Sequence, residues 1–151
     1  MEGQIKEKRA FKTMAENLKT NPQKLKQIYI QAYRKNYTLN KNLLNYALEE
    51  KKKGLKIAIL SDQWWISKEA LITKEFYKNF NPVIISCDVR IRKPNPKVYR
   101  MTLKRLRVKP KESVFIDNQK WNIVPAKKLG MRTVLFKNNK QTIKELNKIL
   151  K

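Results

Sequence analysis

The sequence contains no histidine, and only 12 of its 151 residues are acidic. Without an imidazole, neither a Ser-His-Asp triad nor a histidine-ligated metal site can form. Aspartate occurs only at Asp62, Asp88 and Asp117, and no two of these stand two positions apart. The sequence therefore lacks an Asp-x-Asp pair, and any acid–base chemistry must come from a small set of carboxylates.

Cysteine and long apolar runs are also scarce. The single cysteine, Cys87, excludes an internal disulfide. Because it lies in the apolar run 83–87, we expect a buried small hydrophobe rather than a catalytic thiol. No run approaches the roughly 20 apolar residues of a membrane helix, and residues 1–8 contain no signal-peptide core. We therefore expect a cytoplasmic protein without a membrane partner, built as one domain with a real core.

Positive charge is abundant. The 36 lysines and arginines outnumber the 12 acids, which gives a net charge of +24. Clustered cations are typical of nucleic-acid binding, because they displace counterions from phosphates. These cations are spread along the chain. Arginine, whose planar guanidinium binds phosphate through two hydrogen bonds, is less abundant than lysine. Lys, Asn and Ile are abundant and have codons rich in A and T. A genome of low GC content would therefore give this composition without any selection for binding a polyanion. A basic nucleic-acid or anion-binding module stays an alternative function.

The first part of the chain has apolar residues at helical spacing. This pattern predicts helices over residues 4–20, beginning near Ile5, and from 22 to about 36. Asn21 is a predicted cap for the second helix, with Pro22 in its first turn. A third helix is predicted to start at Thr38 or Asn40 and to stop at Gly54. We expect residues 1–36 to form a separate helical layer and 37–151 to form the main domain.

From residue 55 onward the pattern alternates between short apolar runs and helical spacing. The predicted strands cover residues 56–60, 83–86, 113–116 and 132–136. The predicted helices cover residues 67–79, with Ser67 as cap, and residues 97–106, 121–129 and 142–150. This alternation is typical of an α/β fold with a doubly wound parallel sheet.

Three polar residues lie at or after the ends of predicted strands. Ser61 follows the first strand, Lys93 lies in the loop after the second, and Asp117 follows the third. Ligands bind at the carboxyl ends of strands in an open parallel sheet, so we expect the three to meet. A hydroxyl and an ammonium suit a phosphate, and a carboxylate suits Mg²⁺. Each alone is commonplace, since such residues usually cap helices, start helices or face solvent.

The combination is more specific than its parts. Residues 59–62 (Ile-Leu-Ser-Asp), 92–96 (Arg-Lys-Pro-Asn-Pro) with Tyr99, and 114–118 (Val-Phe-Ile-Asp-Asn) with the helix that follows resemble three motifs of the haloacid dehalogenase-like (HAD) hydrolase superfamily. The resemblance covers about residues 40–151, and 1–36 resemble the tail of a helical cap. It implies that Ser61 and Lys93 bind phosphate, that Asp117 binds Mg²⁺, and that the reaction is phosphoester hydrolysis through an aspartyl intermediate.

The sequence also departs from this family. The Asp-x-Asp that carries the nucleophile, at the end of an N-terminal strand, has no counterpart. Asn118 stands where a second acid is common, and Asp62 where Asn is common. We therefore expect a truncated, split or pseudoenzyme chain that is inactive alone, with Mg²⁺ binding weak or lost. The implied partners are a small phosphorylated substrate, and either self-association or a separately encoded N-terminal fragment.

Two structural questions stay open. In the family, the nucleophile strand lies between the strand ending at Ser61 and the strand ending at Asp117. Without it, these two strands either pair directly or leave their inner edges open. The neighbouring Trp64 and Trp65 either form an aromatic wall over a substrate or pack against the helical layer, and packing is favoured.

Overall fold

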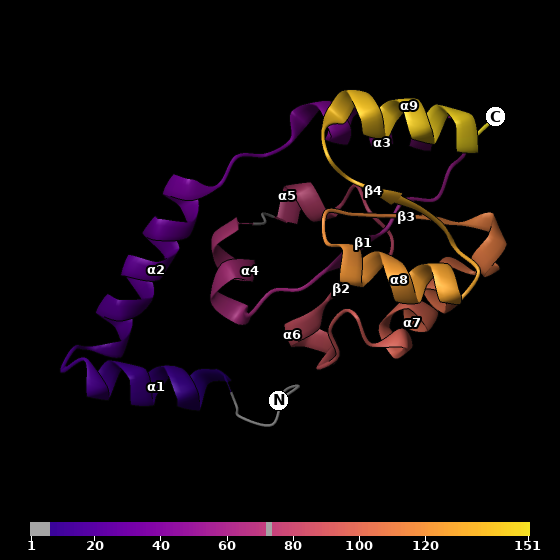
Figure 1. Cartoon of the computed structure of the whole chain (residues 1–151). Helices are drawn as coiled ribbons and strands as arrows, with labels where there is room; N and C mark the ends of the chain where they lie inside the picture. Colours follow the sequence, from indigo (N-terminus) through magenta and orange to yellow (C-terminus); the bar gives the residue numbers. More distant parts are fainter. Residues whose placement is uncertain (1–6, 72–73) are drawn as a thin grey trace.

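A computed structural model describes residues 7–71 and 74–151 (Figure 1). The predicted helical position Ile5 and part of the helix predicted over 67–79 lie outside these residues. The elements are, in chain order, α1 (Glu7–Asn17), α2 (Pro22–Asn36), α3 (Lys41–Lys52), β1 (Ile59–Ser61), α4 (Trp65–Leu71), α5 (Lys74–Tyr77), β2 (Val83–Ile85), α6 (Ser86–Val89), α7 (Pro96–Leu106), the 3-10 turn η1 (Pro110–Glu112), β3 (Val114–Asp117), α8 (Lys120–Lys128), β4 (Arg132–Leu135) and α9 (Asn139–Ile149).

The strands form two parallel pairs rather than one sheet. Strand β1 pairs with β2, with Leu60 opposite Ile84, and β3 pairs with β4, with Ile116 opposite Val134. Each pair is a two-stranded sheet of its own, so β1 and β3 are not hydrogen-bonded to each other. The α/β class with parallel strands is confirmed. Of the two arrangements left open by the sequence, the structure has the one in which the inner strands do not pair.

Helices cover both sides of the strands. Helices α3 and α9 lie together above them in Figure 1, and α7 and α8 lie below. The upper pair is joined by side-chain hydrogen bonds, such as the one from the Tyr46 hydroxyl to Asn147 Oδ1 at 2.7 Å. Below, one apolar cluster joins the two strand pairs through Ile84 of β2 and Phe115 of β3, packed on Tyr99 of α7. The core therefore holds the two sheets together although no strand among the described residues connects them.

The N-terminal helices form their own layer. Helices α1 and α2 stand away from the strands at one side of the molecule, with α4 facing α2 (Figure 1). Their buried residues pack with Ile66 of α4 in a second apolar cluster that includes Trp64 and Trp65. The predicted packing role of these tryptophans is confirmed, and Trp64 Nε1 donates to the Tyr33 hydroxyl at 2.8 Å. The cluster is completed by Phe11, Ala15, Leu25 and Ile30.

The helix caps follow the sequence in most places. Asn21 Oδ1 accepts from the backbone N–H of Gln23 at 2.8 Å, and Asn40 Oδ1 accepts from that of Leu43 at 3.1 Å. Both helix starts are therefore confirmed, with Asn40 rather than Thr38 as the cap of α3. Gly54 has a φ of 100°, the left-handed conformation that ends α3.

Three local predictions were wrong. Ser67 does not cap α4, which begins at Trp65; its hydroxyl instead donates to the Trp64 carbonyl at 3.0 Å from a buried position within the helix. Cys87, expected to be buried, is half-buried in helix α6, and Ser86, predicted as the end of a strand, is the first residue of that helix. The chain leaves β2 there because the Ser86 hydroxyl bonds both backbone groups of Gln63. Ser61 and Asp117 are the last residues of their strands rather than the residues that follow them.

Every helix within residues 7–71 and 74–151 is too short or too polar to cross a membrane.

Candidate functional site

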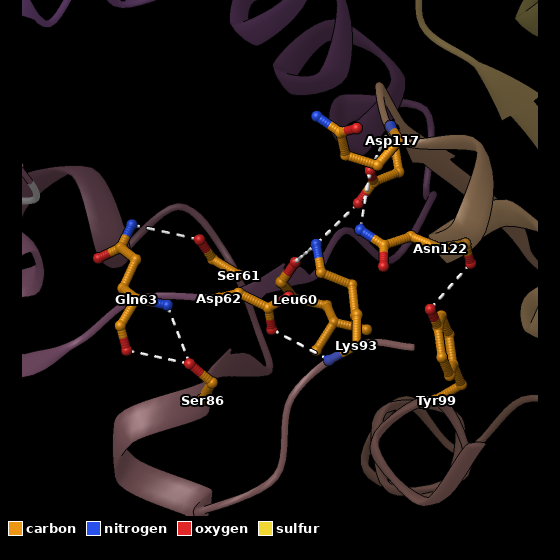
Figure 2. A network of polar contacts seen from close by, with 10 residues as sticks. Leu60, Ser61, Asp62, Gln63, Ser86, Lys93, Tyr99, Asp117 and Asn122 are labelled. Atoms are coloured by element: carbon orange, nitrogen blue, oxygen red, sulfur yellow. Dashed lines mark hydrogen bonds and ion pairs between the residues drawn. The ribbon is translucent and has the colours of Figure 1, made fainter. Parts of the chain in front are cut away.

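Lys93 is the centre of a polar network at the carboxyl ends of β1 and β3 (Figure 2). It lies in the loop between α6 and α7, and its side chain is only 9% exposed. Its ammonium donates to the Leu60 carbonyl at 3.2 Å and to Asp117 Oδ2 at 2.7 Å. One buried cation therefore links the end of β1 to the end of β3.

Asp117 is held from three directions. Besides Lys93 at Oδ2, its Oδ1 accepts from the backbone N–H of Gln119 at 2.8 Å and from Asn122 Nδ2 at 3.1 Å. The side chain is 7% exposed. Because β3 ends at Asp117 and α8 begins three residues later, the turn between them places the Gln119 N–H against the carboxylate. Such a buried charge is retained only with this kind of pairing.

Asn122 and Tyr99 support this carboxylate, and sequence reasoning assigned them no role. Asn122 is 5% exposed in the first turn of α8, and its backbone carbonyl accepts from the buried Tyr99 hydroxyl at 2.8 Å. Burial raises the pKa of Tyr99 well above its usual value, with a smaller contribution from the negative charges of Asp117 and Asp62. The signal that could have revealed Asn122 is its spacing, because a residue five positions after a strand-end acid reaches back from the first turn of the next helix.

Asp62 anchors the Lys93 loop from the other side. Its Oδ1 accepts from the backbone N–H of Lys93 at 3.1 Å, although the residue itself is exposed. The carboxylate therefore fixes the main chain of the loop while the Lys93 side chain reaches the buried ends of the strands. Asp88, the third aspartate, is engaged elsewhere and pairs with Lys68 at 2.8 Å.

Ser61 shares the same end of the sheet but a different network. Its hydroxyl oxygen accepts from Gln63 Nε2 at 3.2 Å, and Figure 2 shows it directed toward Gln63, away from Lys93. The structure thus brings Lys93 and Asp117 into contact and places Ser61 beside them without a direct bond to either. Nearby, Gln63 Oε1 and Asn122 Oδ1 are buried without a hydrogen-bond partner among the described residues.

These residues do not make a complete metal site. Within the part of the chain that the structure describes, no group of three His, Cys, Asp or Glu residues could hold an ion together. Asp117 is the buried carboxylate of the network, and Lys93 already neutralises it. Magnesium accepts one or two carboxylates when water and substrate phosphate fill its other positions. The donor set therefore fits Mg²⁺ only if most ligands come from elsewhere.

Comparison with known proteins agrees with this geometry. The sequence model of the family described as haloacid dehalogenase-like hydrolase matches residues 4–136, which is most of the chain. The chain belongs to the haloacid dehalogenase-like hydrolase family. The resemblance of its three motifs to HAD hydrolases is thereby confirmed. A HAD family enzyme of Bacteroides thetaiotaomicron, crystallised as a magnesium complex, has the same fold, with a TM-score of 0.71 at 20% identity over 90% of this chain and 71% of that one.

Curated relatives of this HAD chain include enzymes of different sizes. Bifunctional epoxide hydrolase 2 of Mus musculus is 33% identical over 117 residues, which cover 74% of this chain and 21% of that protein. Glyceraldehyde 3-phosphate phosphatase of Pyrococcus furiosus is 34% identical over 99 residues, which cover 62% of this chain and 40% of that protein. The chain thus spans about a fifth of the length of the first relative and two fifths of that of the second.

Proposed function

We propose that this chain carries the phosphate-binding part of a HAD-type phosphatase that acts on small phosphorylated substrates. Ser61 and Lys93 bind the phosphate, and Asp117 is the ligand that the protein offers to Mg²⁺. Binding of the ion is weak, because the remaining ligands must come from water and phosphate. Residues 1–36 serve as a helical cap layer over the main domain of residues 37–151, and the protein is cytoplasmic.

The buried ammonium of Lys93 carries this proposal. Two of its three N–H groups are used by the Leu60 carbonyl and by Asp117, so one N–H donor stays available to a ligand. In a buried site, a charge-assisted hydrogen bond to phosphate is stronger than at the surface. The hydroxyl hydrogen of Ser61 adds a second donor, since the contact with Gln63 uses only the oxygen.

The same chain is inactive on its own in this proposal. Formation of an aspartyl intermediate requires a carboxylate oxygen that is free to attack phosphorus. Asp117 is bound to Lys93, Asp88 to Lys68, and Asp62 to the Lys93 backbone. The sequence also has no Asp-x-Asp pair, so in this proposal the nucleophilic carboxylate is supplied either by a separately encoded N-terminal fragment or by a self-associated assembly.

Phosphate binding gives the direct test. Inorganic phosphate is titrated into the full chain at physiological ionic strength, with chloride as the competing anion, and followed by amide NMR shifts. The expected shifts are centred on Ser61, Lys93 and Gln119, and Lys93→Ala abolishes them. Lys97→Ala, on an exposed lysine of the following helix, is the matched control. Equal binding by the two variants would assign phosphate to the general positive surface instead.

A second candidate function rests on a cluster that the sequence did not reveal. Lys104, Arg105 and Arg107 line one open hollow of about 740 Å³ at the other end of the strands, with Pro82 and Met101 among its apolar lining. This hollow is the place where the basic anion-binding alternative would act. If so, glutamine at these three cations weakens salt-dependent binding of a DNA oligonucleotide, while Lys93→Ala leaves it unchanged.

A further inference from the structure

The hollow lined by Lys104, Arg105 and Arg107, here called the basic hollow, has charges of one sign only. The first two residues belong to the last turn of α7, and Arg107 is the residue that ends this helix. All three are exposed. The lining also includes Pro82 and Met101, and no acid is among the lining residues that the structure describes. Three like charges around one hollow repel one another, so a bound anion stabilises the folded chain.

These three cations are not engaged by the protein itself. None of them forms a salt bridge in the part of the chain that the structure describes. The end of α7 does not need their side chains either. The carbonyls of Leu103 and Lys104 accept from the backbone N–H of Arg107. The Leu106 carbonyl accepts from Lys56 Nζ at 3.1 Å. Because other donors already satisfy these helix-end carbonyls, the three side chains are available to a ligand.

The basic hollow has the size and the lining of a small-molecule site. Its volume of about 740 Å³ lies within the range of ligand pockets, roughly 300–1,000 Å³. Met101 lines it and also packs against the main apolar cluster, so the core fixes its position. A thioether and a guanidinium both pack well against an aromatic ring. The exposed amide of Asn81, which lines the same hollow, has donors and an acceptor for the edge of such a ring.

The spacing of the cations favours one small molecule over a nucleic-acid strand. Residues 104–107 lie within one helical turn and span about 5 Å along the helix axis. The other lining residues, Asn81, Pro82, Val83 and Met101, carry no charge. A strand that crosses a surface needs cations along its path to meet successive phosphates. A polyphosphate chain instead concentrates several negative charges in one place, as these cations do with positive charge.

We propose that the basic hollow binds a free nucleoside polyphosphate. Its phosphates pair with Lys104, Arg105 and Arg107, while its base packs on Met101 and meets the Asn81 amide at its edge. The proposal rests on the anion-binding function given as the second candidate, and it narrows the ligand to a small molecule. The proposed phosphate site lies before α7 begins, at the carboxyl ends of the strands, whereas the basic hollow lies where α7 ends. The two sites are therefore separate.

Amide NMR shifts of the full chain show where the ligand binds. ATP without Mg²⁺ is titrated into the protein at physiological ionic strength. Saturable shifts are expected at Asn81, Met101 and residues 104–107. Shifts confined to Ser61 and Lys93 would place ATP in the proposed phosphate site instead and would overturn the proposal.

Two double variants with equal loss of charge separate the hollow from the general positive surface. Arg105→Gln with Arg107→Gln should weaken ATP binding about tenfold, because two charge-assisted hydrogen bonds are lost. Lys127→Gln with Lys128→Gln, at two exposed lysines of α8, is the control and should change the affinity by less than about twofold, since salt screens distant charges. Equal losses would assign ATP to the surface at large and overturn the proposal. All four side chains are exposed, and the NMR spectra themselves report whether each variant is folded.

Two comparison ligands test the choice of a small nucleotide. Tripolyphosphate carries the phosphates without the base and should bind about tenfold more weakly than ATP. Equal affinity would overturn the nucleotide but leave the anion-binding function standing. A short single-stranded DNA that displaces ATP and shifts amides well beyond the hollow would overturn the small molecule in favour of a strand. If none of the three ligands shifted residues 104–107, both the proposal and the second candidate function would fail.

Discussion

The Lys93 ammonium and the Asp117 carboxylate form an ion pair at 2.7 Å in which both side chains are less than a tenth exposed. In the other ion pairs of the described residues, at least one partner is well exposed to solvent. A buried pair depends on both members, because removal of one leaves the other charge without compensation. This ion pair makes Lys93 a structural residue as well as a candidate phosphate-binding residue.

Lys93→Met should therefore destabilise the chain by about 3 kcal/mol, since Asp117 keeps only its bonds to Gln119 and Asn122. Lys68→Met is the matched control. It breaks the exposed pair with Asp88 and should cost less than about 1 kcal/mol. Urea unfolding followed by circular dichroism measures both. Similar losses of unfolding free energy in the two variants would show that the buried pair contributes no more to stability than the exposed pair.

Asp117→Asn should remove whatever Mg²⁺ binding the chain has. Asp117 is the carboxylate held at a strand end beside Lys93, and an amide oxygen is a weaker ligand that carries no charge. Amide NMR shifts during a magnesium titration, with phosphate present, measure the affinity. Asp88→Asn serves as the control, because Asp88 pairs with Lys68 away from this network. Unchanged binding in Asp117→Asn would show that another residue holds the ion.

The order and type of most elements could be predicted because each has a local cause. Asn21, Asn40 and Gly54 set helix ends through bonds or dihedral angles within a few residues. The convergence of Lys93 and Asp117 was also predictable, since parallel strands bring their carboxyl ends to one edge. The direction of the Ser61 hydroxyl was not, because it depends on Gln63, whose backbone is fixed by Ser86, 23 positions later in the chain.

Other features depended on competition that sequence alone does not resolve. Ser67 has the chemistry of a cap, but Trp64 and Trp65 are drawn into the apolar cluster with Phe11, and the helix starts earlier as a result. The separation of β1 from β3 could not be decided from sequence either. Direct pairing would satisfy backbone groups, yet the apolar contacts of Phe115 with Tyr99 and the Lys93 bridge hold the sheets as they are.

The isolated chain should not hydrolyse an aryl phosphate above the buffer rate, with or without Mg²⁺. The reason is the lack of an Asp-x-Asp pair, since Asp117 and Asp88 are bonded at both carboxylate oxygens and Asp62 is an exposed single acid bonded at Oδ1 to the Lys93 backbone. Release of the chromophore is followed at high protein concentration. Magnesium-dependent turnover that Lys93→Ala abolishes would contradict the proposed inactivity and would direct attention to Asp62 or Asp88 as the nucleophile.

The buried Tyr99 predicts a loss of stability in alkaline solution. Its pKa is raised in the folded state, so the folded chain holds this proton more tightly than the unfolded chain. The resulting stabilisation is complete below the ordinary tyrosine pKa of about 10 and is lost as pH rises through the folded value. Tyr99→Phe should flatten the fall in urea midpoint above pH 10. It should also cost about 1 kcal/mol at neutral pH, because the Asn122 carbonyl loses its donor.

Tyr77 provides the comparison for this experiment. Burial, followed by the charge of Asp88, raises the pKa of Tyr77 to about 12, so Tyr77→Phe should flatten the same alkaline slope. Tyr77 does not contact Asn122 in the described network, and its removal should spare the neutral-pH stability that Tyr99 provides. If Tyr99→Phe left the alkaline slope unchanged while Tyr77→Phe flattened it, Tyr99 would not be the group that titrates.

The open edges of β1 and β3 predict that the isolated chain is marginally stable or self-associates. Unpaired backbone groups in a half-buried gap are costly, and they pair readily with other chains. A short apolar peptide ending in Asp-x-Asp should raise the melting temperature, because it binds the folded state only. At a hundred times its Kd the gain is about 2.7 kcal/mol, or several degrees for a domain of this size.

A peptide with proline at its central position is the control, since it cannot pair along both edges. Calorimetry and analytical ultracentrifugation at several protein concentrations provide the two measurements. A monomer that melts cooperatively and ignores the peptide would instead be a self-sufficient pseudoenzyme, whose gap is closed by its own side chains.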